Sequence, residues 1–303
     1  MVLPATFSAF IITPAKVNLG LKIVRRRDDG YHDIYTVMEP VSLVDTIYCE
    51  FHTAPEDSIS FQSPQMMEFD AESNLVVKAA RRMVARAREQ GLSIHGHWNF
   101  WLEKKIPAGA GLGGGSSNAA GIINLLNDFY KLGLESDELI AIAVVIGADI
   151  PFFLAPELSL IEGIGDRITP LKQAQRRYYL LIKPAFSINT GWAYSSLNAP
   201  VASDFSGYDI DQFSGEPEAL SYSLENDFEV SVMASHPQLA EIKAWLAESP
   251  GSLGALMSGS GSVVYAVYSE LAPAVRAEAD ARQRWQDSGC EFFLARNLNL
   301  FHS

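Results

Sequence analysis

The alternation of apolar and polar positions predicts a chain that contains both strands and helices. Segments rich in β-branched and aromatic residues predict strands, at residues 7–24, 45–52, 95–106, 158–165, 176–184, 252–270 and 290–298. We expect the first of these segments to form two strands that meet near Pro14. Apolar positions that recur every three or four residues predict helices, at residues 72–91, 116–133, 135–153, 225–247 and 270–286.

The ends of two predicted helices follow from residues that favour capping. The first helix has Ser73 or Asn74 as its N-cap and stops at Gly91. The third helix has Ser136 as its N-cap. Short polar side chains satisfy the free N–H groups of a first turn, and glycine accepts the left-handed backbone that often ends a helix.

Strands and helices mix here without the strict alternation that a parallel sheet requires, so we predict the α+β class. A length of 303 residues suits two domains. We place them at residues 1–155 and 156–303, because the pattern of predicted helices changes to one of predicted strands near residue 155.

The composition of the chain indicates the cellular compartment in which the protein acts. Cys49 and Cys290 are too few for a disulfide framework and lack metal-ligand spacing, which favours a reducing compartment. The N-terminus lacks a basic region, and Pro4 and Pro14 interrupt its apolar run, so it reads as a strand of the fold. No run of 18 apolar residues predicts a membrane span. We therefore expect a cytoplasmic protein.

The formal net charge of −13 argues against nonspecific binding to nucleic acid or acidic lipid. Two local basic clusters stand out against it. Residues 16–27 hold five basic side chains and no acidic one, and Lys104 and Lys105 form a second cluster. These clusters are consistent with a small anionic ligand, or equally with solvated faces of the protein.

A glycine-rich segment, "PAGAGLGGGSSNAAG" at residues 107–121, directly precedes a predicted helix. Successive backbone N–H groups and the positive end of a helix form a cradle for an anion, with phosphate the obvious guest. Serine hydroxyls add donors or help to hold a metal ion. No lysine follows as a Walker A loop requires, and no opening βαβ strand precedes it as a Rossmann motif requires. The alternatives are a hinge or close helix packing.

Three segments in order resemble the motifs of the GHMP kinases: "PAKVN" at 14–18, "PAGAGLGGGSSNAA" at 107–120 and "SLGALMSGSGSVVYAVY" at 252–268. The resemblance implies an N-terminal ribosomal-S5-like domain, a C-terminal ferredoxin-like domain, and the use of ATP with Mg²⁺. "RRRDDGYHDIYTVM" at 25–38 resembles a segment peculiar to one branch of the family, which phosphorylates a cytidylated sugar alcohol. "IGADIPFFL", "EGIGD" and "LENDFE" resemble later segments of that branch.

The resemblance also implies roles for individual residues. It places Lys16 and Asp149 in the catalytic site. Our hypothesis is that Asp149, in a mostly apolar setting, accepts the proton of the substrate hydroxyl while Lys16 balances the charge that develops. Asn18 lies two residues after Lys16, on the same strand face, and would bind the substrate diol. The remaining ATP-binding positions are Pro107, Ala108, Gly109, Ala110, Gly111, Leu112, Gly113, Gly114, Gly115, Ser116 and Ser117. The cytidine-binding positions are Tyr31, His32, Thr190 and Tyr194.

Each of these roles has a plainer alternative. Lys16 is otherwise a surface lysine, Asn18 an edge residue, "DGYH" a common turn, and Asp149 a cap of the next turn. No residue stands out as the Mg²⁺ ligand; Ser117 is suggested by the wider superfamily alone. His95 and His97 share a strand face but lack a third metal ligand.

Two competing functions are another GHMP kinase, such as a homoserine or mevalonate kinase, and a sensor that has lost catalysis. The "RRRDDGYH" segment argues against the first, and Lys16 with Asp149 against the second. We expect a small-molecule substrate, no nucleic acid or membrane partner, and a monomer or weak homodimer.

Overall fold

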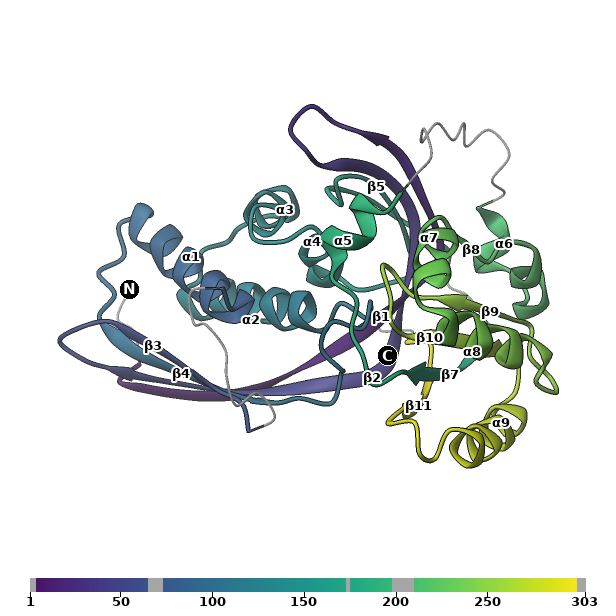
Figure 1. The fold of residues 1–303 in the computed structure, drawn as a ribbon. Coiled ribbons are helices and arrows are strands. Elements are labelled where there is room, and N and C mark those ends of the chain that lie inside the picture. The colour runs from purple at the N-terminus through teal and green to yellow at the C-terminus, as the bar shows by residue number, and fades with distance from the viewer. Residues whose placement is uncertain (1–3, 65–72, 173–174, 198–209, 299–303) are drawn as a thin grey trace. The chain divides into compact units, whose positions relative to one another are not determined.

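The computed structural model describes residues 4–64, 73–172, 175–197 and 210–298 (Figure 1). The chain divides into two compact units. Unit one comprises Met1–Ala15, Val44–Ile106 and Gly113–Ala155, and unit two comprises Lys16–Leu43, Pro107–Leu112 and Pro156–Ser303. Neither unit is one continuous stretch of chain, whereas the predicted domains are. The predicted limits stay a prediction, although the last passage between units falls between Ala155 and Pro156.

Two long strands, β1 (Thr6–Arg26) and β2 (His32–Thr53), carry the chain through both units. The prediction of two strands meeting near Pro14 is wrong, since β1 continues through this residue. Proline lacks the N–H of a ladder bond, so strands tolerate it at an open edge. Among the described residues, β8 pairs with β1 only at Gly20 and Leu21, which leaves Pro14 beyond that pairing.

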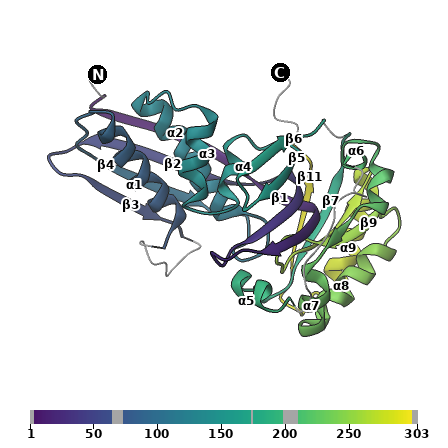
Figure 2. The same ribbon diagram turned by 90° about the horizontal axis from the view of Figure 1, so that it is seen from above.

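Unit one packs helices on the sheet formed by β3 (Ser58–Gln62), β4 (Gly96–Glu103) and the unit-one parts of β2 and β1, in the order β3-β4-β2-β1. Alternate residues of β4 are buried, as the pattern predicted. Helices α1 (Leu75–Glu89) and α2 (Gly114–Tyr130) lie side by side over these strands (Figure 2). Asn74 caps α1 by accepting hydrogen bonds from Val76 N and Val77 N, which selects one of the two predicted caps.

The helix predicted at residues 135–153 is two helices, α3 (Ser136–Val144) and α4 (Ile150–Leu154). Glu135 is the N-cap of α3 and forms a capping box with Glu138, so Ser136 is not the cap. Glycine at 147 and proline at 151 explain the break between the helices.

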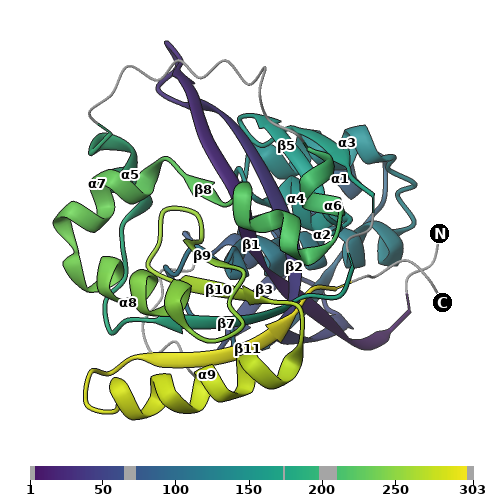
Figure 3. The same cartoon turned by 90° about the vertical axis from the view of Figure 1, so that its right-hand side faces the viewer.

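The sheet of unit two has the strand order β11-β7-β10-β9, with antiparallel neighbours throughout. Its strands are β7 (Tyr178–Lys183), β9 (Gly254–Met257), β10 (Val264–Tyr268) and β11 (Glu291–Arg296). Helices α8 (Pro237–Glu248) and α9 (Leu271–Arg284) cover it (Figure 3). Ala266 of β10 lies opposite Leu180 and Ala255, and all three belong to the core between sheet and helices.

Unit two contains further short elements around this sheet. They are β5 (Ser159–Gly163), β6 (Arg167–Pro170), β8 (Glu225–Asn226), α5 (Thr190–Ser195), α6 (Asp211–Ser214), η1 (Pro217–Tyr222) and α7 (Phe228–Ser235). β5 pairs with both β2 and β6. The helix predicted at 225–247 breaks at His236, because Pro237 starts a new helix and cannot continue the old one.

A buried polar cluster ties the N-terminal part of unit two to its C-terminal part. Glu39 on β2 accepts hydrogen bonds from Tyr179 Oη and from Asn297 Nδ2 (3.3 Å) and lies 3.4 Å from Arg177 Nη1. Asn297 Nδ2 also donates to Gln175 O (2.9 Å). Burial raises the pKa of Glu39, while the charge of Arg177 opposes that shift.

Taken together, both units mix strands with helices, so the predicted α+β class is confirmed. Among the described residues, every helix is too short or too polar to cross a lipid bilayer.

Candidate active site

Lys16 and Asn18 lie side by side on β1, and both are buried. Lys16 Nζ donates a hydrogen bond of 2.6 Å to Asn18 Oδ1. Asn18 Nδ2 donates to Thr36 Oγ1 (2.9 Å), and Thr36 Oγ1 donates to Gly20 O (2.6 Å). The amide of Asn18 is therefore held in one orientation and aims its oxygen at the lysine amine. This arrangement excludes the alternative of Lys16 as a surface lysine.

Backbone bonds join the strand that carries Lys16 to the glycine loop 107–112. Lys16 N donates to Leu112 O (3.0 Å), and Val263 N donates to Ala110 O (3.1 Å). Ser258 Oγ donates to Gly111 O (2.8 Å). Carbonyls of the loop thus bond to protein groups, as an anion-binding loop requires, because a carbonyl oxygen facing phosphate would repel it.

Two glycines of this loop have backbone angles that side chains rarely allow, with φ +60° at Gly109 and +78° at Gly111. An added Cβ at Gly111 would overlap the carbonyl of Ser258. The facing turn also needs glycine: at Gly259 φ is +56°, and an added Cβ would lie 3.3 Å from Lys16 Nζ. Two glycine-rich segments thus approach each other beside the lysine amine.

The N-terminus of α2 in unit one continues the glycine loop. Its N-cap is Gly113, at φ +69°, and no side chain caps the helix there. Ser117, in the first turn, is buried, and within the described residues its hydroxyl has no hydrogen-bond partner. An orphaned hydroxyl at an uncapped helix start matches a site for an oxyanion or its metal ion.

Asp45 shapes the segment that leads into the loop, a role that sequence reasoning missed. Its Oδ1 accepts hydrogen bonds from Lys105 N (2.7 Å) and Ile106 N (2.8 Å), and its Oδ2 pairs with Lys104 Nζ (2.6 Å). An added Cβ at Gly114 would lie 2.8 Å from that same lysine nitrogen. Burial lowers the pKa of Lys104, and the charge of Asp45 opposes that shift. Lys104 Nζ, paired with Asp45, therefore lies beside the first turn of α2.

Asp149 occupies the N-cap position of α4, but its side chain makes no capping hydrogen bond. The alternative of Asp149 as a cap is therefore wrong. The residues that follow, Ile150, Phe152 and Phe153, are buried and apolar, as expected. Asp149 belongs to unit one and Lys16 to unit two, so the pairing of their charges stays a prediction.

The predicted cytidine-binding residues fall in unit two. The ring of His32 stacks on that of Tyr194, with centroids 4.7 Å apart and planes at 22°. Thr190 Oγ1 lies 3.0 Å from Ser260 Oγ, next to the turn that faces Lys16. Tyr31 is 59% exposed. Burial, and less strongly the charge of Arg26, lower the pKa of His32, which favours the neutral form of its ring.

The basic residues of segment 16–27 mostly find carboxylate partners. Lys22 pairs with Glu225 (2.5 Å), and both Arg25 (2.5 Å) and Arg27 (3.2 Å) pair with Asp33. These pairs favour the alternative of a solvated, charge-balanced face for this part of the segment. Among the described residues, no three His, Cys, Asp or Glu side chains cluster, and this holds around His95 and His97 as well.

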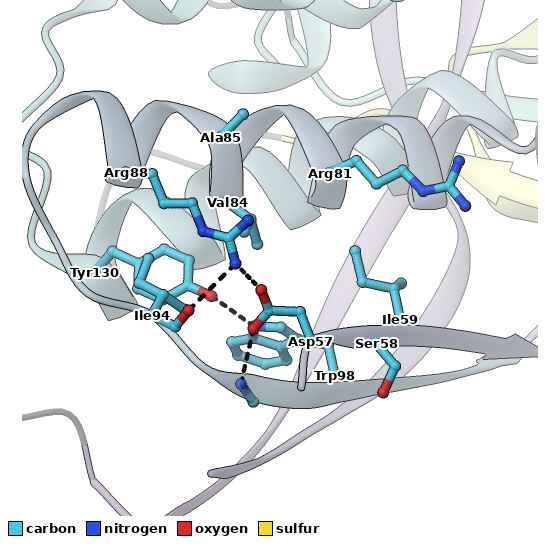
Figure 4. A pocket seen from close by; sticks show the side chains of 11 residues that line it. Asp57, Ser58, Ile59, Arg81, Val84, Ala85, Arg88, Ile94, Trp98 and Tyr130 are labelled. Atoms are coloured by element: carbon cyan, nitrogen blue, oxygen red, sulfur yellow. Dashed lines mark hydrogen bonds and ion pairs between the residues drawn. The ribbon is translucent and has the colours of Figure 1, made fainter. Parts of the chain in front are cut away.

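Figure 4 shows a pocket of about 390 Å³ in unit one that contains none of the predicted site residues. Arg88 pairs with Asp57 and donates to Ile94 O (3.2 Å), and Trp98 Nε1 donates to Tyr130 Oη (2.8 Å). These polar side chains bind one another, and we assign the pocket no role in the site.

Family models identify the class of protein. The GHMP kinases N terminal domain matches residues 74–156, and the GHMP kinases C terminal domain matches residues 215–287. Together with the glycine loop and the buried lysine, these matches define a small-molecule kinase of the GHMP class. GHMP kinases use ATP, and the orphaned hydroxyl of Ser117 and the glycine cradle fit its phosphates.

Individual relatives narrow this class. 4-Diphosphocytidyl-2-C-methyl-D-erythritol kinase of Syntrophus aciditrophicus is 38% identical over 269 residues, covering 88% of this chain and 92% of the relative. The enzyme of the same name from Nostoc sp. is 32% identical over 305 residues, covering 95% of each chain. A crystal structure of 4-(cytidine 5'-diphospho)-2C-methyl-D-erythritol kinase has 30% identity and a TM-score of 0.75, covering 95% of this chain and 99% of that one. The chain therefore belongs to this family of GHMP kinases.

More distant structures share the fold alone. A homoserine kinase from Cytophaga hutchinsonii superposes with a TM-score of 0.69 at 16% identity, covering 98% of this chain and 96% of that one. This likeness confirms the two-domain GHMP kinase fold that the three motifs implied.

Proposed function

We infer that this chain phosphorylates the 2-hydroxyl of 4-diphosphocytidyl-2-C-methyl-D-erythritol with ATP, in the non-mevalonate pathway to isoprenoid precursors. The observation that carries this inference is the likeness to kinases of that name along 88% to 95% of the chain.

In the proposed reaction, the 2-hydroxyl oxygen attacks the γ-phosphorus of ATP. The bond between that phosphorus and the β–γ bridging oxygen breaks, and ADP leaves with the electron pair. Asp149 accepts the proton of the hydroxyl, and Lys16 balances the negative charge that develops on the transferring group. Support comes from the burial of Lys16 and from the hydrogen bond between its amine and Asn18 Oδ1.

We propose that the loop from Pro107 to Ser117 holds the ATP phosphates with its backbone N–H groups. Mg²⁺ would accompany ATP and neutralise its phosphate charge. Ser117 is the residue that fits a role toward the metal ion, because its buried hydroxyl has no partner among the described residues. Ser116 is less buried and supplies a second hydroxyl at the same helix start.

The cytidine part of the substrate is assigned to Tyr31, His32, Thr190 and Tyr194. An aromatic ring stacks on a pyrimidine, and an imidazole beside it can bond the base edge. The observed stack of His32 on Tyr194 shows that these two rings already lie together. The diol is assigned to Asn18, whose amide also contacts Lys16.

Purified protein tests this function directly. ADP release should require the cytidylated sugar alcohol and should not be supported by homoserine or mevalonate. Release with either of those two alcohols would identify a different GHMP kinase. Binding of ATP and the cytidylated alcohol without any phosphoryl transfer would identify a sensor.

We further propose that the chain acts in the cytoplasm as a monomer or weak homodimer. Cys49 and Cys290 are both free, which agrees with a reducing compartment. Sedimentation over a range of protein concentrations would establish the oligomeric state.

A further inference from the structure

The side chain of Asn226 is fully engaged at a turn that faces the site. Asn226 lies on β8 and is 6% exposed. Its Nδ2 donates to Met257 O and to Gly259 O, each at 2.8 Å. Its Oδ1 accepts from Phe228 N at 3.0 Å. One amide group thus binds the carbonyls on both sides of Ser258 and fixes the turn between them.

This turn contacts both parts of the site that lie in unit two. Ser258 Oγ donates to Gly111 O in the glycine loop (2.8 Å). At Gly259 the backbone is so close that an added Cβ would lie 3.3 Å from Gly111 O and from Lys16 Nζ. A shift of the turn would therefore move the loop, the space around the lysine amine, or both.

The segment that holds Asn226 is also bonded to the strand that carries Lys16. Asp227 N donates to Leu21 O (3.0 Å), and Ile23 N donates to Asp227 Oδ2 (2.8 Å). Lys22 Nζ pairs with Glu225 (2.5 Å). Residues 225–227 therefore hold β1 on one side and the Met257–Gly259 turn on the other.

We propose that Asn226 is a positioning residue for phosphoryl transfer: it sets the Met257–Gly259 turn against Lys16 and the glycine loop. This proposal rests on the assignment of Lys16 and the loop to the site. Alanine at 226 leaves two buried carbonyls without their donors, which the turn relieves by moving toward other partners. Phosphoryl transfer depends on alignment, so a displacement well under an ångström lowers kcat.

The test compares Asn226→Ala with Asn297→Ala. Asn297 is a matched control, because it is also a buried asparagine of unit two whose Nδ2 binds two oxygens, in the polar cluster around Glu39. We expect similar losses in melting temperature, whereas kcat falls at least tenfold further in Asn226→Ala. The KM for the cytidylated alcohol should stay within twofold of wild type. Equal kcat values in the two variants would overturn the proposal.

A double-mutant cycle with Ser258→Ala sharpens the test and removes only a hydroxyl. If Asn226 acts through the turn, the loss in kcat of the double variant is smaller than the product of the two single losses. Losses that simply multiply would show that Asn226 acts elsewhere. Should Asn226→Ala fail to fold, Asn226→Ser retains one donor and takes its place in the cycle.

Lys16→Ala, assayed alongside, separates this proposal from the function on which it rests. Activity that survives in Lys16→Ala would refute the site itself. Activity lost in Lys16→Ala but retained in Asn226→Ala would refute the positioning role alone.

Discussion

The glycine loop 107–112 and the turn at residues 27–33 both belong to unit two and are held in opposite ways. In the loop, carbonyls bind buried protein donors, and glycines take angles that side chains exclude. In the turn, Arg27 pairs with Asp29 and Asp33 near the surface, and Tyr31 is mostly exposed. The proposed phosphate end of the site is thus built by backbone, and the proposed cytidine end by side chains.

This difference indicates which kinds of change should impair the loop and which should impair the turn. A backbone cradle fails when any side chain enters it, because interiors and close backbone contacts cannot absorb an extra atom cheaply. Exposed ion pairs contribute little each and weaken with salt. We therefore expect large, discrete effects from changes in the loop, and small, graded effects that depend on salt and pH from changes near the turn.

The largest effect on activity is expected at Asp149, which lies in neither region. Its substitution distinguishes an effect on the chemical step from an effect on binding. Asp149→Asn keeps the shape but cannot accept the proton. General-base catalysis contributes about 10²–10⁴ in rate, or roughly 3–5 kcal/mol. Steady-state kinetics should show kcat lower by that factor while ATP affinity changes little.

Asp137→Asn, at the exposed first turn of α3, is the control and should retain full activity. Retention of more than about a third of wild-type kcat in Asp149→Asn, with chemistry rate-limiting, would refute the base assignment.

The next effect probes the backbone cradle itself. Gly111→Ala places a Cβ onto the Ser258 carbonyl, so ATP affinity measured by calorimetry should fall at least about thirtyfold, or about 2 kcal/mol. Gly133→Ala is the matched control: its φ is also positive (+61°), but nothing lies within 4 Å of an added Cβ. Both variants share the backbone strain, and only the first blocks the loop. Equal ATP affinity in the two would remove the loop from the ATP site.

A smaller effect is expected at the cytidine end. If His32 and its neighbours bond the base edge, a cytidine nucleotide should compete with the substrate about tenfold better than the matching uridine nucleotide. A site that bonds an amino group leaves its own polar groups unpaired when the analogue lacks that group. Inhibition constants from steady-state assays measure the ratio. A ratio near one would contradict the cytidine assignment.

The smallest effect concerns pH. The pKa of His32 is lowered, first by burial and then by Arg26, so its neutral ring is the form that the fold favours. The neutral ring contributes fully above the ordinary histidine pKa of about 6.5. That contribution is lost as the pH falls through the lowered pKa of His32. Affinity for a cytidine nucleotide should fall about two- to threefold on acidification below that value. In His32→Asn this step should disappear; a step of the same size in that variant would assign it to another group.

Local signals in the sequence predicted the local features of this structure. The cap of α1 was predicted to within one residue, as Ser73 or Asn74, because capping depends on residues two and three positions away. The loop glycines were recognised because they cluster before a helix. The break between α7 and α8 was missed, although Pro237 carries its signal, because the apolar period on both sides outweighed it.

The features that could not be predicted from the sequence depend on residues that are distant in the chain. Asp45 bonds to residues 104–106, and Asn226 to residues 257 and 259, and nothing near either residue in the sequence indicates these partners. The first half of β2 was missed for a similar reason. In the sequence, Glu39 is a polar residue that interrupts the strand pattern. In the structure it is buried, because Arg177 and Tyr179, about 140 positions later, are its partners.

The way β1 and β2 thread both units has a consequence for the order of synthesis. Residues 16–43 leave the ribosome early, yet their partners in unit two, among them β5, β8, Tyr179 and Asn297, are translated more than a hundred residues later. The nascent chain must carry this β1–β2 segment without these later partners until they have been translated. Because Lys16 lies on this segment, the surroundings of the lysine amine form only after the turn at Ser258 and Gly259 has been translated.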